Sequence, residues 1–302
     1  MAVAETIRET PEPEEAATFR EFHEIPESPP PALRYRRGLH FIHAMKELWH
    51  NRHTMFNLGF REIRVQYNQA ILGLAWAVLT PVVQMVVFTV FFKNFAGIKV
   101  QTHGVSYPVF LYTGLLAWGF FSSATTSAGQ VLVSNPLLNK IYAPREVFPL
   151  ATIGTSAFNS VISTLVLAFL CVMYQDWLQP EAIWVPLLLL VLVGFTVGVG
   201  LIVSALTVYL RDLRQALPLL LQVGLFVSSV VVGIDTIPAR WRGLYCFLDP
   251  PAMVIDALRQ TALYGNQPNL TYLGLSSVST VIVLVGGYLL FKQLETGFAD
   301  VS

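Results

Sequence analysis

Charged side chains are scarce in this sequence. Asp, Glu, Lys and Arg make up 13% of the 302 residues, against about 25% in a typical soluble domain. Apolar residues make up 54%, and several uncharged runs reach the length of about 20 residues that crosses a bilayer as a helix. These values exclude an ordinary soluble domain and predict an all-α integral membrane protein.

Residues and motifs that carry chemistry are also missing. Two cysteines, Cys171 and Cys246, do not make a disulfide framework. The sequence contains no GxxxxGKS/T, HExxH, GxSxG or CxxC, the short motifs of P-loop ATPases, zinc proteases, serine hydrolases and dithiol sites. We therefore expect no catalytic residue, no metal site and no cofactor in this chain.

The first 70 residues change from acidic to basic. Residues 1–33 are rich in Glu and Pro and poor in apolar side chains, which predicts a disordered cytoplasmic tail. Residues 34–70 carry Arg and Lys among apolar residues, which predicts an amphipathic interface region on the membrane surface. Arg61 and Arg64 lie where this region meets the first uncharged run.

Residues 71–302 are predicted to form a transmembrane domain with both ends in the cytoplasm. Six spans are expected, at about 71–92, 108–133, 148–174, 183–209, 216–236 and 272–291. Twelve Lys and Arg flank the spans on one side and five on the other, and the richer side is cytoplasmic. No span carries a central charge, so the energy for uphill transport must come from another polypeptide.

Two shorter features lie within this domain. Residues 234–271 are too polar to cross and contain PPAMVIDALRQTAL, which predicts a short helix or a broken pair dipping into the outer face. Pro250 and Pro251 favour Asp249 as a helix N-cap. Gly194, Gly198 and Gly200 predict close helix packing, and a contact within the subunit is favoured over a dimer seam.

Several runs carry a family resemblance. In chain order they are REIRVQYNQAILGLAWAVLTPVVQMVVFTVFF, YTGLLAWGFFSSA, SNPLLNKIYAPREVFPL, YLRDLRQALPLLLQ and FKQLETGFADV. Together they resemble the permease subunits of polysaccharide ABC exporters, the Wzm family, which move O-antigen, teichoic acid or galactan. The resemblance implies a homodimer of six-span subunits in the cytoplasmic membrane. It also implies two separate ATPase subunits that bind ATP and Mg, and a lipid-linked polysaccharide as substrate.

The resemblance also assigns candidate site residues. It implies an ATPase-coupling segment containing Lys140, Tyr142, Arg145 and Glu146. It implies an outer gate containing Asp249, Pro250, Asp256 and Arg259. Arg61 and Arg64 would meet the lipid pyrophosphate or serve as membrane anchors. Aromatic faces stack on sugar rings, so the candidates for the translocation path are Trp76, Phe88, Phe91, Tyr112, Trp118, Phe120 and Phe121, although the same residues suit membrane interfaces and packing.

Three alternatives stay open at this point. A permease of the same architecture for another lipid or a drug has the same composition. A membrane-embedded enzyme acting on lipid-linked sugars would require Asp249 or Asp256 and no ATPase. A non-transporting scaffold is the third, and no sequence feature favours it.

Overall fold

The computed structural model describes residues 52–68, 75–95, 102–134, 144–231 and 233–298. All regular secondary structure within these ranges is helical. The predicted tail at 1–33 and residues 34–51 of the predicted interface region lie outside the described residues.

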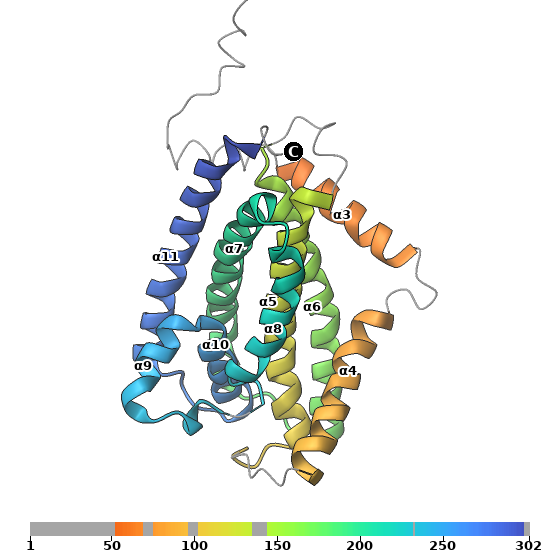
Figure 1. Ribbon diagram of the computed structural model, residues 1–302. Coiled ribbons are helices and arrows are strands. Elements are labelled where there is room, and N and C mark those ends of the chain that lie inside the picture. The colour runs from red at the N-terminus through yellow and green to blue at the C-terminus, as the bar shows by residue number, and fades with distance from the viewer. Residues whose placement is uncertain (1–51, 69–74, 96–101, 135–143, 232, 299–302) are drawn as a thin grey trace, which may run out of the picture. The chain divides into compact units, whose positions relative to one another are not determined.

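The long helices of the described residues run side by side as a bundle (Figure 1). They are α4 (Ala75–Thr89), α5 (Tyr107–Ser134), α6 (Val147–Tyr174), α7 (Val185–Tyr209), α8 (Leu213–Val227) and α11 (Leu270–Glu295). The π-turn η1 (Val90–Phe95) extends α4, and the 3-10 turn η2 (Pro180–Trp184) leads into α7. Helix α5 packs against α6 and α7, and α7 packs against α11 on its other side.

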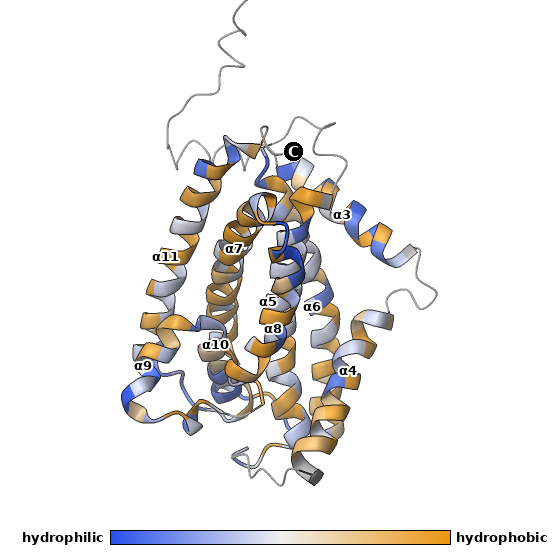
Figure 2. Ribbon diagram, viewed as in Figure 1, coloured by the Kyte–Doolittle hydropathy of each residue, from blue (hydrophilic) through white to orange (hydrophobic). Residues whose placement is uncertain are grey.

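Within the described residues, four helical segments are long and apolar enough to cross a membrane. They are Ala75–Phe92, Val147–Tyr174, Pro180–Tyr209 and Leu270–Glu295, and they coincide with the first, third, fourth and sixth predicted spans. Figure 2 shows α7 as hydrophobic over most of its length, whereas α3 (Arg52–Asn68) mixes hydrophilic and hydrophobic turns. The prediction of a multi-pass, all-helical membrane protein is confirmed for the described residues.

The second and fifth predicted spans have a different character. Helix α5 has 28 residues, about 42 Å at 1.5 Å per residue, but Ser, Thr and Gln in its second half make it less apolar. Helix α8 has 15 residues and ends at Val227, so it covers only the first part of the predicted span at 216–236. The chain turns at Ser228 and Ser229, where Ser229 takes a positive φ of 37°.

A short helical pair follows the end of α8. After η3 (Ile234–Thr236) come α9 (Ala239–Leu248), α10 (Pro250–Leu258) and the π-turn η4 (Arg259–Leu263). Pro250 and Pro251 force the break between α9 and α10, because proline has no N–H to continue a helix and restricts the residue before it. Helix α10 is buried against α5, α7 and α11. The short helices predicted in this segment are therefore present.

Helix α7 meets α11 through glycines. A Cβ on Gly287 would overlap the backbone carbonyl of Gly198, and a Cβ on Gly198 would overlap the backbone at Val283 and Leu284. Only glycine permits backbones to approach this closely. The predicted glycine contact is thus an intrasubunit one, between α7 and α11.

Helix α3 lies at the end of the bundle where α11 finishes, opposite α9 and α10 (Figure 1). Its Leu58 is buried against Val147, Phe148 and Ala151 at the start of α6. Phe56 and Phe60 stay exposed. An amphipathic helix therefore exists at 52–68, and its place at the membrane interface stays a prediction.

Candidate functional site

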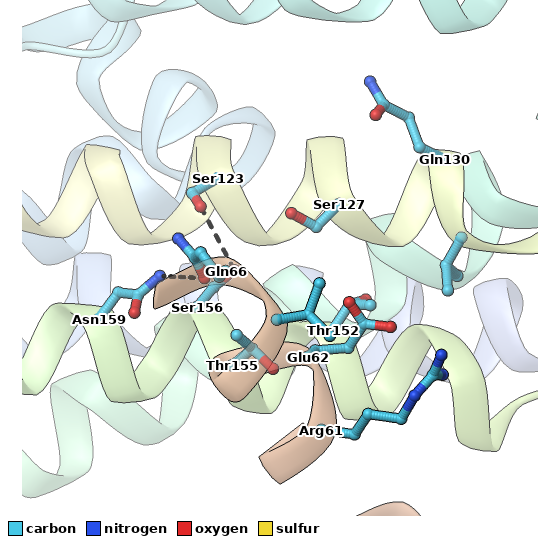
Figure 3. A pocket seen from close by; sticks show the side chains of 12 residues that line it. Arg61, Glu62, Gln66, Ser123, Ser127, Gln130, Thr152, Thr155, Ser156 and Asn159 are labelled. Atoms are coloured by element: carbon cyan, nitrogen blue, oxygen red, sulfur yellow. Dashed lines mark hydrogen bonds between the residues drawn. The ribbon is translucent and has the colours of Figure 1, made fainter. Parts of the chain in front are cut away.

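A polar pocket of about 440 Å³ lies between α3, α5 and α6 (Figure 3). Twelve residues line it: Arg61, Glu62, Val65 and Gln66 of α3, Ser123, Ser127, Gln130 and Val131 of α5, and Thr152, Thr155, Ser156 and Asn159 of α6. Val65 and Val131 are the apolar members of this lining. The rest offer hydroxyl, amide, carboxylate or guanidinium groups.

The spacing of these residues explains why they converge. Thr152, Thr155, Ser156 and Asn159 stand at i, i+3, i+4 and i+7, which is one face of α6. Residues 123, 127 and 130 of α5 follow the same spacing. A polar face exposed to lipid would be costly. The fold instead turns both faces toward each other, and α3 lies across the gap between them (Figure 3).

Hydrogen bonds tie the three helices around the pocket. Ser123 Oγ and Ser156 Oγ are 3.3 Å apart, which joins α5 to α6. Asn159 Nδ2 donates to Gln66 Oε1 at 3.5 Å, and the Tyr67 hydroxyl donates to Asn159 Oδ1 at 2.5 Å, which joins α6 to α3. Ser127 makes no hydrogen bond within the described part of the chain. Hydrogen bonds therefore connect the three helices that form the pocket, while the Ser127 hydroxyl is available for a further hydrogen bond.

Arg61 and Arg64, the predicted pyrophosphate or interface residues, differ in their relation to the pocket. Arg61 lines the pocket, whereas Arg64 is exposed and outside the lining. Sequence reasoning missed the polar faces of α5 and α6. The signal was present in the helical spacing of Ser, Thr and Asn within two otherwise apolar spans.

A buried charge cluster joins the start of α6 to the end of α11. Glu146 immediately precedes α6, and its side chain is fully buried. Lys292 Nζ lies 2.8 Å from each carboxylate oxygen of Glu146 and 2.9 Å from Glu295 Oε2. Burial raises the pKa of Glu146, and the Lys292 ammonium opposes this rise. Glu146 is thus an internal anchor rather than a surface group.

Arg145 reaches the same end of α11. Its guanidinium carbon lies 5.4 Å from the centre of the Phe298 ring, and Phe298 is buried against Phe291 and Tyr209. Lys140 and Tyr142 lie outside the described residues. The coupling role of this segment stays a prediction, but the structure places Arg145 and Glu146 beside α11, which sequence reasoning did not foresee.

The opposite end of the bundle is held by one buried arginine. Arg259 is 1% exposed, and its guanidinium donates to the carbonyls of Phe110 at 3.1 Å, Ser229 at 2.9 Å and Val230 at 2.6 Å. The guanidinium also lies 3.6 Å from the centre of the Phe110 ring. Arg259 therefore fixes η4 to the start of α5 and to the turn after α8.

The predicted N-cap is confirmed. Asp249 accepts a hydrogen bond from the Ala252 N–H at 3.2 Å, and the Ser228 hydroxyl donates to its other carboxylate oxygen. Pro250 occupies the first position of α10. Asp256 lies on the same helix, and burial raises its pKa to about 6, with Arg259 opposing the rise. The gating role of these residues stays a prediction.

The predicted aromatic set divides into two groups. Tyr112, Trp118, Phe120 and Phe121 belong to the main buried core, and Phe88 packs edge-on against Phe92 and Phe226. Trp76 and Phe91 are more than half exposed. In the described structure most of the set packs the interior of the subunit, and its role in a translocation path stays a prediction.

The described residues contain no group of three or more His, Cys, Asp or Glu that could hold a metal ion. The enzyme alternative requires Asp249 or Asp256. One carboxylate oxygen of Asp249 caps α10, and the other accepts a hydrogen bond from the Ser228 hydroxyl. The described residues thus offer hydrogen bonding in the pocket and ion pairing where Glu146 meets Lys292.

Similarity to known proteins extends over most of the chain. An O-antigen export system permease protein RfbA of Klebsiella pneumoniae is 26% identical over 260 residues, which is 82% of this chain and 97% of the relative. RfbA of Myxococcus xanthus is 24% identical over 261 residues, 86% and 99% of the two chains. The polysialic acid transport protein KpsM of Escherichia coli is 26% identical over 249 residues, 80% and 93%.

These relatives agree with the resemblance seen in the sequence runs, which is thereby confirmed. Residues 55–263 match the family described as ABC-2 type transporter. The match begins within α3 and ends with η4, so it includes every residue of the polar pocket and of the Arg259 anchor. The chain belongs to the ABC-2 type transporter family.

Proposed function

We propose that this chain is the permease subunit of an ATP-driven exporter that moves a lipid-linked polysaccharide across the cytoplasmic membrane. The observation that carries the proposal is the near-complete coverage of the relatives named as O-antigen export permeases, 97% and 99% of their lengths. A match of that extent includes the whole permease rather than one shared segment.

Six crossings with both termini in the cytoplasm are part of this proposal. Four segments of the described chain have the length and apolarity of spans, and α5 has the length. Helix α8 is about 23 Å long, shorter than a bilayer core of about 30 Å. The turn at residues 228–231, which follows α8, is buried inside the bundle, where irregular backbone is tolerated because protein surrounds it.

A separate ATPase is the proposed source of energy. The chain has no GxxxxGKS/T motif, so ATP and Mg would be bound by the partner. Two copies of this chain and two ATPase subunits form the proposed complex. The segment containing Lys140, Tyr142 and Arg145 is the proposed docking element, and Glu146 is its anchor to α11 through Lys292.

This arrangement supports a simple mechanism of coupling. A movement of the docking segment is passed to α6, which it precedes, and to α11 through the Glu146–Lys292 pair. Arg145 adds a contact with Phe298, just beyond the end of α11. Helix α11 in turn packs on α7 and α9, and α7 packs on α10. Motion at one end of the bundle thereby reaches the proposed outer gate at the other.

Co-purification tests the proposal. The tagged chain is extracted from its native membrane in mild detergent, and the eluate is assayed for ATP hydrolysis. A co-purifying ATPase that survives washing is expected. Recovery of the folded chain alone, from cells that export polymer normally, would contradict the proposal and would favour the enzyme alternative.

A further inference from the structure

We propose that the polar pocket between α3, α5 and α6 is a subsite for a single sugar unit of a glycosylated lipid phosphate. The inference rests on the proposed function and adds where and how the cargo is recognised. It depends on the convergence of three polar helix faces on one cavity of about 440 Å³.

The size and chemistry of the pocket fit a polyhydroxylated ligand. Small-molecule sites in proteins span about 300–1,000 Å³, and this cavity falls within that range. Its lining combines Ser and Thr hydroxyls with the side-chain amides of Gln66, Gln130 and Asn159. Each of these groups can both donate and accept, as every hydroxyl of a sugar does. Several of these groups already bond to one another or to backbone carbonyls. The Ser127 hydroxyl, which has no hydrogen bond within the described residues, would gain a partner from a sugar but not from a hydrocarbon or an aromatic drug.

The charges favour a neutral sugar inside the pocket. Arg61 and Glu62 are the charged residues of the lining, and they are adjacent on α3. Together they give the lining no net charge, so the pocket has no excess of positive charge with which to hold a bare phosphate. Arg61 is exposed, which leaves its guanidinium available to an anionic group outside the cavity.

The pocket has no aromatic side chain on which a sugar ring could stack, and this keeps the expected affinity low. None of the twelve lining residues is aromatic, so hydrogen bonds supply the recognition. A hydrogen bond contributes a net of about 0.5–1.5 kcal/mol in water-accessible sites. A few such bonds give weak and reversible binding, which suits a cargo that must move on.

Its depth suits a lipid-borne ligand. Thr152 and Asn159 follow the first residue of α6 by five and twelve positions, or about 8 and 18 Å along the helix. The pocket therefore lies below the proposed cytoplasmic surface, within reach of a headgroup whose lipid stays in the bilayer. Amphipathic α3, with Phe56 and Phe60 exposed, covers it from the side of that surface.

Cysteine protection tests this inference. Ser127→Cys is placed in the chain, reconstituted in lipid nanodiscs and labelled with a maleimide. Cys171 and Cys246 are both buried, so the parent chain supplies the background rate. The probes are polyprenyl pyrophosphates bearing glucose, galactose or N-acetylglucosamine, and bare polyprenyl pyrophosphate. Gln215→Cys, exposed and outside the pocket, is the matched control.

At least one glycosylated probe is expected to slow labelling of Ser127→Cys severalfold, while bare polyprenyl pyrophosphate and the control position show no effect. Ser127→Ala should weaken binding of that probe by about twofold to tenfold, the value of one hydrogen bond. Equal protection by bare polyprenyl pyrophosphate would overturn the sugar assignment. Absence of protection by every probe would overturn the site.

Failure here is distinct from failure of the proposed function. If labelling is unprotected while the same chain co-purifies with an ATPase and supports export, the permease role stands without this subsite. If neither ATPase nor export is found, the proposed function itself is wrong.

Discussion

Lys292 holds both carboxylate oxygens of Glu146 at 2.8 Å, although the two residues are 146 positions apart. The pair connects the segment that leads into α6 with the last turn of α11. Glu146 has no exposed side-chain surface, so its ionised form depends on this one cation. The pair therefore connects the proposed docking segment to the C-terminal helix.

Removal of the Lys292 ammonium group should lower the stability of the folded protein strongly. Lys292→Met leaves a buried, unpaired carboxylate, and breaking a buried pair in this way costs about 3–5 kcal/mol. Thermal unfolding of the purified protein measures the loss. The double variant Glu146→Gln with Lys292→Met should recover most of it, because no buried charge remains. Equal stability of the single and double variants would contradict the anchor.

Charge reversal at Arg145 tests docking. Arg145→Glu should abolish polymer export and ATPase co-purification, while insertion and the amount of protein in the membrane stay normal, because the Arg145 side chain contacts only the Phe298 ring among the described residues. Arg240→Glu, at the opposite end beside Trp241, is the control and should export normally. Normal export by the Arg145 variant would exclude this docking role.

Substitutions at two glycines of α5 separate a clash with the Arg259 side chain from the general effect of alanine on helix stability. A Cβ on Gly114 would overlap the Arg259 guanidinium, whereas a Cβ on Gly119 meets nothing within 4 Å. Gly114→Ala should lower the unfolding temperature. Gly119→Ala should leave it unchanged or raise it, because alanine is favoured over glycine in a helix by about 1 kcal/mol. Identical shifts in the two variants would remove the argument for a tightly fitted anchor.

Asp256 predicts a pH dependence of stability. Its pKa in the folded protein is raised to about 6 by burial, with Arg259 opposing the rise and Asp235 adding to it. A carboxyl whose pKa is raised on folding favours the folded state when protonated, and this contribution is lost as the pH rises through about 6. Asp256→Asn should therefore become more stable relative to the parent between pH 5 and pH 8. A constant difference across that range would contradict the assignment.

Hydropathy was sufficient to predict four of the spans and the multi-pass class. Long uncharged runs leave few other structures in a bilayer. The end of α8 at Val227 could not be predicted, because the apolar run continues to Ile234 without a charge. Asp249 as an N-cap could be predicted, since capping depends on neighbours in sequence.

The candidate site was harder to predict from the sequence than the spans were. The partner of Glu146 is Lys292 and the partners of Arg259 are distant carbonyls, so these roles depend on tertiary structure alone. Tyr112 and Phe121 suit stacking on a sugar as well as they suit a core, and only the fold shows that they pack inside the subunit. The helical spacing of the polar residues on α6 is visible in the sequence. The pocket forms only because the fold places the polar face of α5 opposite that of α6, and the sequence does not show this placement.

The location of the polymer after depletion of this chain tests the export claim most directly. Cells depleted of the protein are fractionated, and the lipid-linked polysaccharide is measured on the cell surface and on the cytoplasmic side of the membrane. The permease function predicts that finished polymer accumulates on the cytoplasmic side while the surface loses it. Unchanged surface polymer, or loss of polymer synthesis with no cytoplasmic accumulation, would contradict an export role.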